Sequence, residues 1–186
     1  MQSVTLKPMK TIKLKDKTFR INIPSDEILS QVKRVAQEID KDYESKRPLF
    51  VVVLNGAFMF ASDLMKYVNT ECEISFVKLS SYQGTQSTET VKEIIGLNQS
   101  IDGRDIIIVE DIVDTGITME NLLNDLHKMS PKSISIATLL YKPESFQKDF
   151  DIQYVGFSIP NDFIVGYGLD YDELGRNLSD IYIITN

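Results

Sequence analysis

Three carboxylates and a small polar turn lie close together at the end of an apolar run. In the segment DIIIVEDIVDTGIT (105–118), Glu110, Asp111 and Asp114 precede the sequence TGIT. That turn can present backbone N–H groups and two hydroxyls at the start of a helix, and its glycine permits close approach, so it suits a monoester phosphate. The carboxylates would repel phosphate and must serve sugar hydroxyls, a metal or a proton. The segment therefore predicts a sugar-phosphate site, with the phosphate in the turn and the diol facing Glu110 and Asp111.

Two phosphate-binding fingerprints of other folds are absent from the sequence. It contains neither GxxxxGK[ST], the P-loop signature, nor GxGxxG, the dinucleotide-binding signature. The alternative interpretation is a strand, an acidic turn and an ordinary capped helix. Three carboxylates within five residues, followed by TGIT, are uncommon in such a connection, so the functional interpretation is favoured.

Strands that are apolar on both faces must position this site. Three runs have this character: LFVVVL (49–54), DIIIV (105–109) and SISIATLL (133–140). Helical patterns occupy 57–68 and 119–129, and a further strand is expected at 73–80. This alternation predicts an α/β fold, a mostly parallel sheet flanked by helices. In open sheets of this kind ligands bind beyond the carboxyl ends of the strands, where the TGIT turn lies.

The N-terminal part predicts a hairpin and a helix. Residues up to Ile23 alternate weakly in polarity and suggest a hairpin around Asp16-Lys17. A helix with one buried face should follow Pro24, with Ser25 as its N-cap.

The C-terminal part predicts a small lobe. From about Tyr141 the chain has short strand-like pieces joined by irregular links. We expect a single domain, 1–186, whose lobe is formed mainly by about 141–186 with N-terminal residues. The polar segment SYQGTQSTET (81–90) has no periodicity, is longer than an ordinary connection and is interpreted as a lid.

Composition and charge exclude several classes of protein. The chain is 42% hydrophobic and 25% charged, which excludes global disorder and coiled coil. A net charge of −7 disfavours sequence-independent nucleic-acid binding. One cysteine, Cys72, and one histidine, His127, exclude an internal disulfide and a multi-histidine metal centre. No secretory signal or membrane span is recognisable, so we expect a soluble cytoplasmic protein with no nucleic-acid or membrane partner.

The acidic segment resembles the signature of a known family. VEDIVDTGIT (109–118) is similar to the diphosphate-sugar-binding motif of the type I phosphoribosyltransferases. The combination of further motifs narrows the resemblance to the hypoxanthine (hypoxanthine-guanine) branch, and it runs in order from about residue 49 to residue 180. These motifs are the pyrophosphate loop LNGAFMFASDL (54–64), the lid LSSYQG (79–84), and the base-binding segments LLYKPE (139–144), DFIVGYGLDYDE (162–173) and Arg176.

The resemblance implies an activity and its partners. The family transfers 5-phosphoribosyl from its 1-diphosphate to hypoxanthine or guanine, giving IMP or GMP and pyrophosphate in purine salvage. It implies Mg²⁺ as cofactor, with Asp170, Glu110 and Asp111 as candidate metal ligands, because the leaving group is strongly anionic. It also implies a homodimer or homotetramer.

Roles at the sugar follow from the same resemblance. Asp114 lies between the carboxylate pair and the turn, so it is placed near the base, and by the resemblance it takes a proton from the purine imidazole ring. Glu110 and Asp111 are expected to bind the ribose hydroxyls, directly or through the metal. The 5-phosphate would be held, largely by backbone groups, at Thr115, Gly116, Ile117 and Thr118.

The pyrophosphate side departs from the family in one place. Asn55 and Gly56 match the pyrophosphate loop, but the family often carries lysine where this chain has Asn55, so only amide donation remains. The family also tends to have a non-proline cis peptide in this loop. Arg176 resembles a pyrophosphate clamp, and Ser81 and Tyr82 resemble the lid.

Recognition of the base is assigned to four residues. Lys142 can donate to a 6-oxo group and would reject a 6-amino group. By the resemblance, Phe163 stacks on the purine and Ile164 offers backbone groups to its edge. Asp170, in the same lobe, is also assigned to the base site by the resemblance.

Two alternatives remain open from the sequence. One is a phosphoribosyltransferase for another base, xanthine or uracil, although Lys142 and Phe163 argue against uracil. The other is a non-catalytic regulator that senses the diphosphate sugar. Some such regulators bind RNA, which the acidic charge and the absence of any Lys/Arg cluster disfavour.

Overall fold

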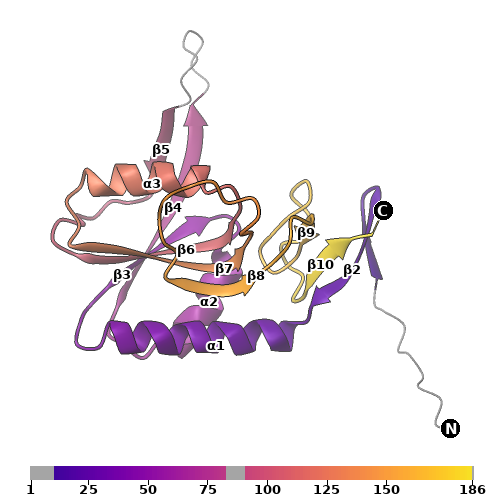
Figure 1. The fold of residues 1–186 in the computed structure, drawn as a ribbon, viewed down its shortest axis with the longest axis horizontal. Coiled ribbons are helices and arrows are strands. Elements are labelled where there is room, and N and C mark those ends of the chain that lie inside the picture. Colours follow the sequence, from indigo (N-terminus) through magenta and orange to yellow (C-terminus); the bar gives the residue numbers. More distant parts are fainter. Residues whose placement is uncertain (1–10, 83–90, 186) are drawn as a thin grey trace.

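A six-stranded sheet forms the centre of the computed structural model, which describes residues 11–82 and 91–185 (Figure 1). Its strand order is β5-β4-β3-β6-β7-β8, and all neighbouring pairs are parallel except β4 with β5. Helices α1 and α2 cover one face and α3 the other (Figure 1). The elements of this layer are α1 (Ser25–Asp42), β3 (Leu49–Leu54), α2 (Phe58–Tyr67), β4 (Glu73–Tyr82), β5 (Val91–Ile95), β6 (Asp105–Val113), α3 (Ile117–His127), β7 (Ser133–Tyr141) and β8 (Tyr154–Ser158).

The apolar character of the central strands follows from this two-sided burial. Along β3, Phe50 and Val52 pack under α1 and α2, whereas Val51 and Val53 pack under α3. All four are fully or almost fully buried. The predicted parallel α/β sheet flanked by helices is therefore confirmed, with the antiparallel edge strand β5 as an addition that the sequence did not reveal.

A second, smaller sheet joins the two ends of the described chain. It has the order β1-β2-β10-β9, is antiparallel throughout, and consists of β1 (Thr11–Leu14), β2 (Lys17–Ile23), β9 (Ile164–Val165) and β10 (Ile181–Ile184). The expected hairpin forms, with its turn at Lys15-Asp16, one residue earlier than expected. The carboxyl ends of β7 and β8 point toward this small sheet (Figure 1).

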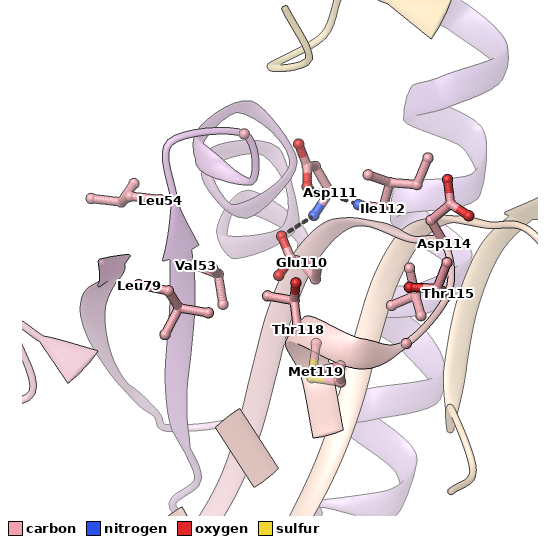
Figure 2. Close-up of a pocket in the computed structure, with 13 residues that line it drawn as sticks. Val53, Leu54, Leu79, Glu110, Asp111, Ile112, Asp114, Thr115, Thr118 and Met119 are labelled. Carbon is pink, nitrogen blue, oxygen red and sulfur yellow. Dashed lines mark hydrogen bonds between the residues drawn. The ribbon is translucent and has the colours of Figure 1, made fainter. Parts of the chain in front are cut away.

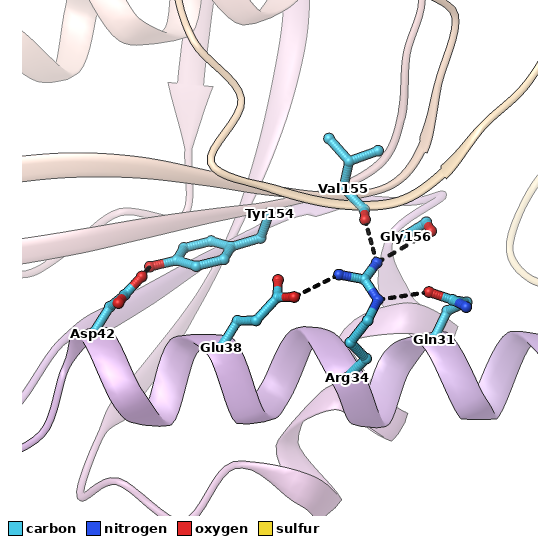
Figure 3. A network of polar contacts seen from close by, with 7 residues as sticks. All are labelled: Gln31, Arg34, Glu38, Asp42, Tyr154, Val155 and Gly156. Atoms are coloured by element: carbon cyan, nitrogen blue, oxygen red, sulfur yellow. Dashed lines mark hydrogen bonds and ion pairs between the residues drawn. The ribbon is translucent and has the colours of Figure 1, made fainter.

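The segment at 154–158 belongs to the main sheet and not to the lobe. We expected all strand-like pieces after Tyr141 in the lobe, but β8 pairs in parallel with β7, from Ala137↔Tyr154 to Tyr141↔Ser158. Arg34 of α1 fixes this edge strand by donating to the Val155 carbonyl at 2.6 Å and to the Gly156 carbonyl at 3.3 Å (Figure 3). A sheet edge with unpaired carbonyls is satisfied by such side-chain donors.

Strand β6 is longer than its apolar run. We expected the strand to end at Glu110-Asp111, yet pairing with β7 continues to Val113↔Tyr141. Pairing with β3 stops earlier, at Val52↔Val109. The second half of β6 therefore carries its carboxylates past the last hydrogen-bonded pair on the β3 side.

The N-terminus of α1 is capped from a distance. We expected Ser25 as the N-cap, but the cap position is Pro24 and no side chain of this segment caps the helix. The Ser25 N–H instead donates to Asp180 Oδ1 at 2.9 Å. Asp180 is buried beside β10 and accepts from the Tyr182 hydroxyl at 3.3 Å, so it links α1 to the small sheet.

No helix in the described ranges 11–82 and 91–185 is long and apolar enough to cross a membrane.

Replacing Asp180 by Ala should lower the free energy of unfolding by about 1–2 kcal/mol, because the helix loses both a hydrogen-bond acceptor and a charge that favours its N-terminus. Urea unfolding measures the difference. The matched control is Ser25→Ala, which should stay within about 0.5 kcal/mol of the wild type, since the Ser25 side chain makes no capping bond. Equal destabilisation by both substitutions would contradict the distant cap.

Candidate active site

A cavity of about 310 Å³ opens between the carboxyl ends of β3 and β6 and the start of α3. Figure 2 shows Val53 and Leu79 on one side of the Glu110 carboxylate, and Asp114 and Thr115 on the other. The cavity thus brings the acidic pair and the TGIT turn together, as the sequence predicts. Its lining residues are Val53, Leu54, Gly56, Leu79, Glu110, Asp111, Ile112, Val113, Asp114, Thr115, Gly116, Thr118 and Met119.

The two β6 carboxylates are neighbours, Glu110 buried and Asp111 half-buried. Glu110 is only 9% exposed, and its Oε1 accepts the Asp111 N–H at 3.1 Å. Asp111 Oδ1 accepts the Ile112 N–H at 2.9 Å. The Asp111 carboxylate also lies directly against Gly56, where any side chain would overlap it. The acidic pair on β6 and the loop after β3 are therefore in contact.

Burial controls the protonation of this pair. It raises the pKa of Glu110 well above its usual value, and repulsion from the Asp111 charge raises it further. Burial also raises the pKa of Asp111, although hydrogen bonds from its neighbours and the positive charge of Arg176 oppose that rise. The site therefore disfavours two negative charges until a cation or hydroxyl donors arrive.

The TGIT turn is shaped to receive an anion. Gly116 occupies the N-cap position of α3 with a left-handed φ of 81°, a conformation that favours glycine. Behind the turn, a Cβ atom at residue 116 would lie 2.7 Å from Phe146, and the Gln147 N–H donates to the Thr115 carbonyl at 3.2 Å. Ile117 is exposed, and Thr118 lines the cavity. The turn is thus held firmly from behind and leaves the helix N-terminus facing the cavity.

Asp114 and Lys142 form an ion pair at the rim of the cavity. Lys142 follows β7, and its Nζ lies 3.0 Å from Asp114 Oδ2. The Lys142 side chain is 12% exposed and the Asp114 side chain 46%, so the pair lies at the boundary with solvent. The Lys142 N–H donates to the Val113 carbonyl at 3.0 Å, which fixes the start of this loop against β6. A candidate base and a candidate oxo-group donor are therefore adjacent.

The loop after β3 and Arg176 approach each other. Asn55 is exposed and follows a cis peptide bond at Leu54-Asn55, in the loop where we expected one. Arg176 Nη2 lies 2.7 Å from Asp170 Oδ1, and its Nη1 donates to the Gly168 carbonyl at 3.0 Å. Arg176 also acts on the charge of Asp111. The guanidinium is therefore held near the acidic pair, although neither Arg176 nor Asp170 lines the cavity.

The expected base-binding residues lie outside the cavity lining. Phe163 is 46% exposed and packs edge-on against Tyr171, with ring centroids 5.8 Å apart, and tilted against Phe19 at 6.3 Å. Ile164 is buried in β9 and pairs with Ile183 of β10. Phe163 thus offers an exposed ring that the small sheet holds in place.

The expected lid falls partly outside the described residues. Ser81 and Tyr82 end β4, where their backbones pair with Lys92 and Val91 of β5. Residues 83–90 of the expected lid are not among the residues that the structure describes.

Sequence reasoning missed the apolar wall of the cavity. Leu54 and Leu79 follow strand patterns and Met119 follows a helix pattern, so each was indistinguishable from a core residue. Among the described residues, no cluster of three or more His, Cys, Asp or Glu side chains is arranged to hold a metal ion by itself.

Glu110→Gln should stabilise the fold, and more so at high pH. A carboxyl whose pKa is raised by folding favours the folded state at low pH, and this contribution is lost as the pH rises through the folded-state pKa. The glutamine of the variant cannot ionise. The free energy of unfolding of the variant should therefore exceed that of the wild type, and the difference should be larger at pH 8 than at pH 5. Urea unfolding at both values measures this, with exposed Glu44→Gln as control. An advantage that is equal at the two pH values would rule out the buried charge as its cause.

Comparison with known proteins agrees with this geometry. A family model described as phosphoribosyl transferase domain matches residues 24–172. A hypoxanthine-guanine phosphoribosyltransferase of Streptococcus thermophilus is 41% identical over 166 residues, which cover 89% of this chain and 92% of that protein. The crystal structure of a hypoxanthine phosphoribosyltransferase from Staphylococcus aureus matches with a TM-score of 0.81 and 39% identity, over 89% of this chain and 90% of that one.

A longer relative matches equally well. The chain is 42% identical over 166 residues to the bifunctional protein TilS/HprT of Listeria monocytogenes, and the match covers 89% of this chain but only 26% of that protein. The matches include both the acidic strand β6 and the TGIT turn, within a family model that spans most of the chain. The chain therefore belongs to the phosphoribosyltransferase family, among the relatives of the hypoxanthine-guanine phosphoribosyltransferases.

Proposed function

We propose that the protein transfers a 5-phosphoribosyl group from 5-phosphoribosyl 1-diphosphate to hypoxanthine or guanine, giving IMP or GMP and pyrophosphate. The observation that carries this proposal is the cavity that is lined both by buried Glu110 and half-buried Asp111 and by the N-terminus of α3. A sugar phosphate matches that arrangement at both ends, because its diol needs acceptors and its phosphate needs N–H donors. The names of the S. thermophilus and S. aureus relatives support the same reaction.

The ribose end uses the buried pair and the turn. Glu110 and Asp111 would accept hydrogen bonds from the ribose hydroxyls, and their raised pKa values mean that this contact also relieves an unfavourable burial. The 5-phosphate would take N–H groups at the start of α3, aided by the helix dipole. The proposed phosphate contacts are Thr115, Gly116, Ile117 and Thr118.

The base end uses the ion pair at the rim. In the reaction, the bond from the sugar anomeric carbon to the diphosphate oxygen breaks, and a bond from that carbon to a purine imidazole nitrogen forms. We assign to Asp114 the proton that this nitrogen loses, and to Lys142 the hydrogen bond to the 6-oxo group. Lys142 Nζ lies 3.0 Å from Asp114 Oδ2, which supports the proposal that both side chains contact the same base. Phe163, exposed and held by Phe19 and Tyr171, would stack on the base.

The leaving group would meet the loop after β3 and Arg176. Asn55 and Gly56 would contact the pyrophosphate, and the planar guanidinium of Arg176 suits two of its oxygens. Asn55 carries no charge, so in this chain the positive charge near the pyrophosphate would come from Arg176. Ser81 and Tyr82 would belong to a lid that closes over the diphosphate sugar and keeps water away from it.

Magnesium fits the available donors. Glu110, Asp111 and Asp170 offer only carboxylate oxygens, and Mg²⁺ is usually held by one or two carboxylates together with substrate phosphates rather than by a complete protein cage. When bound, it would offset the negative charge of the departing pyrophosphate. Among the residues of the protein, Arg176 would offset the pyrophosphate charge, because its positive charge lies near Asp111. A cytoplasmic setting and a homodimer or homotetramer are part of the proposal.

Base choice tests the function directly. Hypoxanthine and guanine should be converted to nucleotides and adenine should not, with the discrimination about 10⁴-fold or more, because Lys142 has donors and no acceptor. The assay adds the diphosphate sugar and Mg²⁺ to hypoxanthine, guanine, xanthine, uracil or adenine, with a chelator arm that should abolish turnover. Lys142→Met should weaken both oxopurines and narrow the gap to adenine, whereas the exposed surface control Lys128→Met should change nothing. Equal use of adenine and hypoxanthine by the wild type would overturn the assignment of Lys142.

Replacing Asp114 by Asn preserves its shape and removes the proton acceptor. We expect turnover to fall by roughly 10²–10⁴-fold, with little change in affinity for the diphosphate sugar. Steady-state kinetics and a direct binding measurement separate the two effects. The control is Asp125→Asn on α3, whose carboxylate pairs with Lys128 at 2.7 Å. Wild-type turnover in the Asp114 variant would remove this residue from the role of base.

A further inference from the structure

A buried tyrosine joins the small sheet to the helix behind the pyrophosphate loop. The Tyr167 hydroxyl donates to Asp63 Oδ2 of α2 at 2.6 Å, and Tyr167 is only 2% exposed. The other Asp63 oxygen pairs with Lys66 at 2.7 Å, so the carboxylate is held between two partners. Burial and the Asp63 contact raise the pKa of Tyr167 above its ordinary value, so the hydroxyl stays protonated and remains a donor.

The backbone around Tyr167 is held in an unusual conformation. Gly166, Tyr167 and Gly168 all have positive φ, at 105°, 50° and 102°. Such a conformation is uncommon for a tyrosine and persists only where the surroundings enforce it. The Tyr167 N–H donates to the Leu178 carbonyl at 2.8 Å, so the residue is fixed at both its backbone and its side chain.

This turn makes the contact with the pyrophosphate loop. Gly168 packs so closely on the Gly56 carbonyl that a side chain at position 168 would overlap it. The Gly168 N–H donates to the Arg176 carbonyl at 2.9 Å, and the Gly168 carbonyl accepts from Arg176 Nη1 at 3.0 Å. Gly168 therefore sets the distance between Gly56 and Arg176, the two groups assigned to the leaving group.

We propose that Tyr167 is a positioning residue for the pyrophosphate side of the site, acting through its hydrogen bond to Asp63. The inference rests on the proposed function, because it takes Gly56 and Arg176 as the pyrophosphate contacts. Tyr167 does not line the cavity, so it acts at a distance from the proposed substrate. Its hydroxyl ties the turn at 166–168 to α2, the helix that follows the pyrophosphate loop, and so keeps Arg176 and Gly56 in register.

The test compares two tyrosines that make the same kind of bond. Tyr167→Phe removes the hydroxyl bond to Asp63, and Tyr154→Phe removes the bond from Tyr154 to Asp42 Oδ2, 2.9 Å long, between β8 and α1 (Figure 3). We expect Tyr167→Phe to raise the KM for the diphosphate sugar, and the Kd for pyrophosphate with Mg²⁺ present, by roughly 5- to 30-fold. The KM for hypoxanthine should stay within about 2-fold. Tyr154→Phe should leave all three constants unchanged while both variants lose some thermal stability.

A second pair of variants separates the bond from the packing of the ring. Asp63→Asn keeps an oxygen that accepts from Tyr167, so its Kd for pyrophosphate should stay within about 3-fold of the wild type, whereas Asp63→Ala should match Tyr167→Phe. Wild-type pyrophosphate affinity in Tyr167→Phe or in Asp63→Ala would overturn the inference.

Failure of the proposed function gives a different result. In that case the wild type would transfer phosphoribose to none of the tested bases. Calorimetric titration with pyrophosphate needs no turnover, so it still decides the role of Tyr167. Absence of pyrophosphate binding to the wild type in that titration would overturn the inference as well.

Discussion

The arrangement of the whole site depends on holding two adjacent carboxylates, buried Glu110 and half-buried Asp111, in the second half of β6. Glu110 and Asp111 lie beyond the last pair that β6 forms with β3, and burial there raises the pKa of both. Such a position is unfavourable for charge in the absence of compensation. The sheet creates it, because β7 continues to pair with β6 for several residues after β3 has turned away. The proposed site for hydroxyls and a cation would therefore lie at a position that costs the folded protein some stability.

The surroundings of this pair are shaped to accept it. Gly56 leaves room for the Asp111 carboxylate, and Arg176 brings a compensating positive charge. Arg176 comes from a segment far along the chain, so the small sheet must be placed accurately on the main one. Asp180 contributes to this placement by capping α1, and the turn at 166–168 does so by packing on the loop after β3. In the proposed function the small sheet would therefore help to position the site and not only cover it.

Different residues along the cavity are assigned to different parts of the proposed substrate. In the proposed function, the N-terminus of α3 would offer N–H groups to the phosphate, Glu110 and Asp111 would accept from the sugar, and the Asp114–Lys142 pair would meet the base at the rim. These groups come from the second half of β6 and the residue after it, from the start of α3 and from the residue after β7, and the parallel pairing of β6 with β7 brings them to one edge of the sheet. If Asn55 and Arg176 contact the pyrophosphate as proposed, Arg176 would carry a larger share of the positive charge on that side, because Asn55 stands where the family often has lysine.

Much of the fold and of the site was predictable from the sequence, because both are encoded in short contiguous patterns. Apolar runs such as 49–54 and 133–140 specify strands that are covered on both faces, and TGIT after an acidic strand specifies an anion site at a helix start. What the tertiary structure alone decided involves partners that are distant in the chain: Asp180 as the cap of α1 in place of Ser25, β8 as an edge strand of the main sheet, and Tyr167 bonded to Asp63. Local periodicity reports the faces and ends of an element, but it carries no information on which remote residue will satisfy a particular hydrogen bond. Those pairings arise only when packing of the complete chain fixes the distance between the elements.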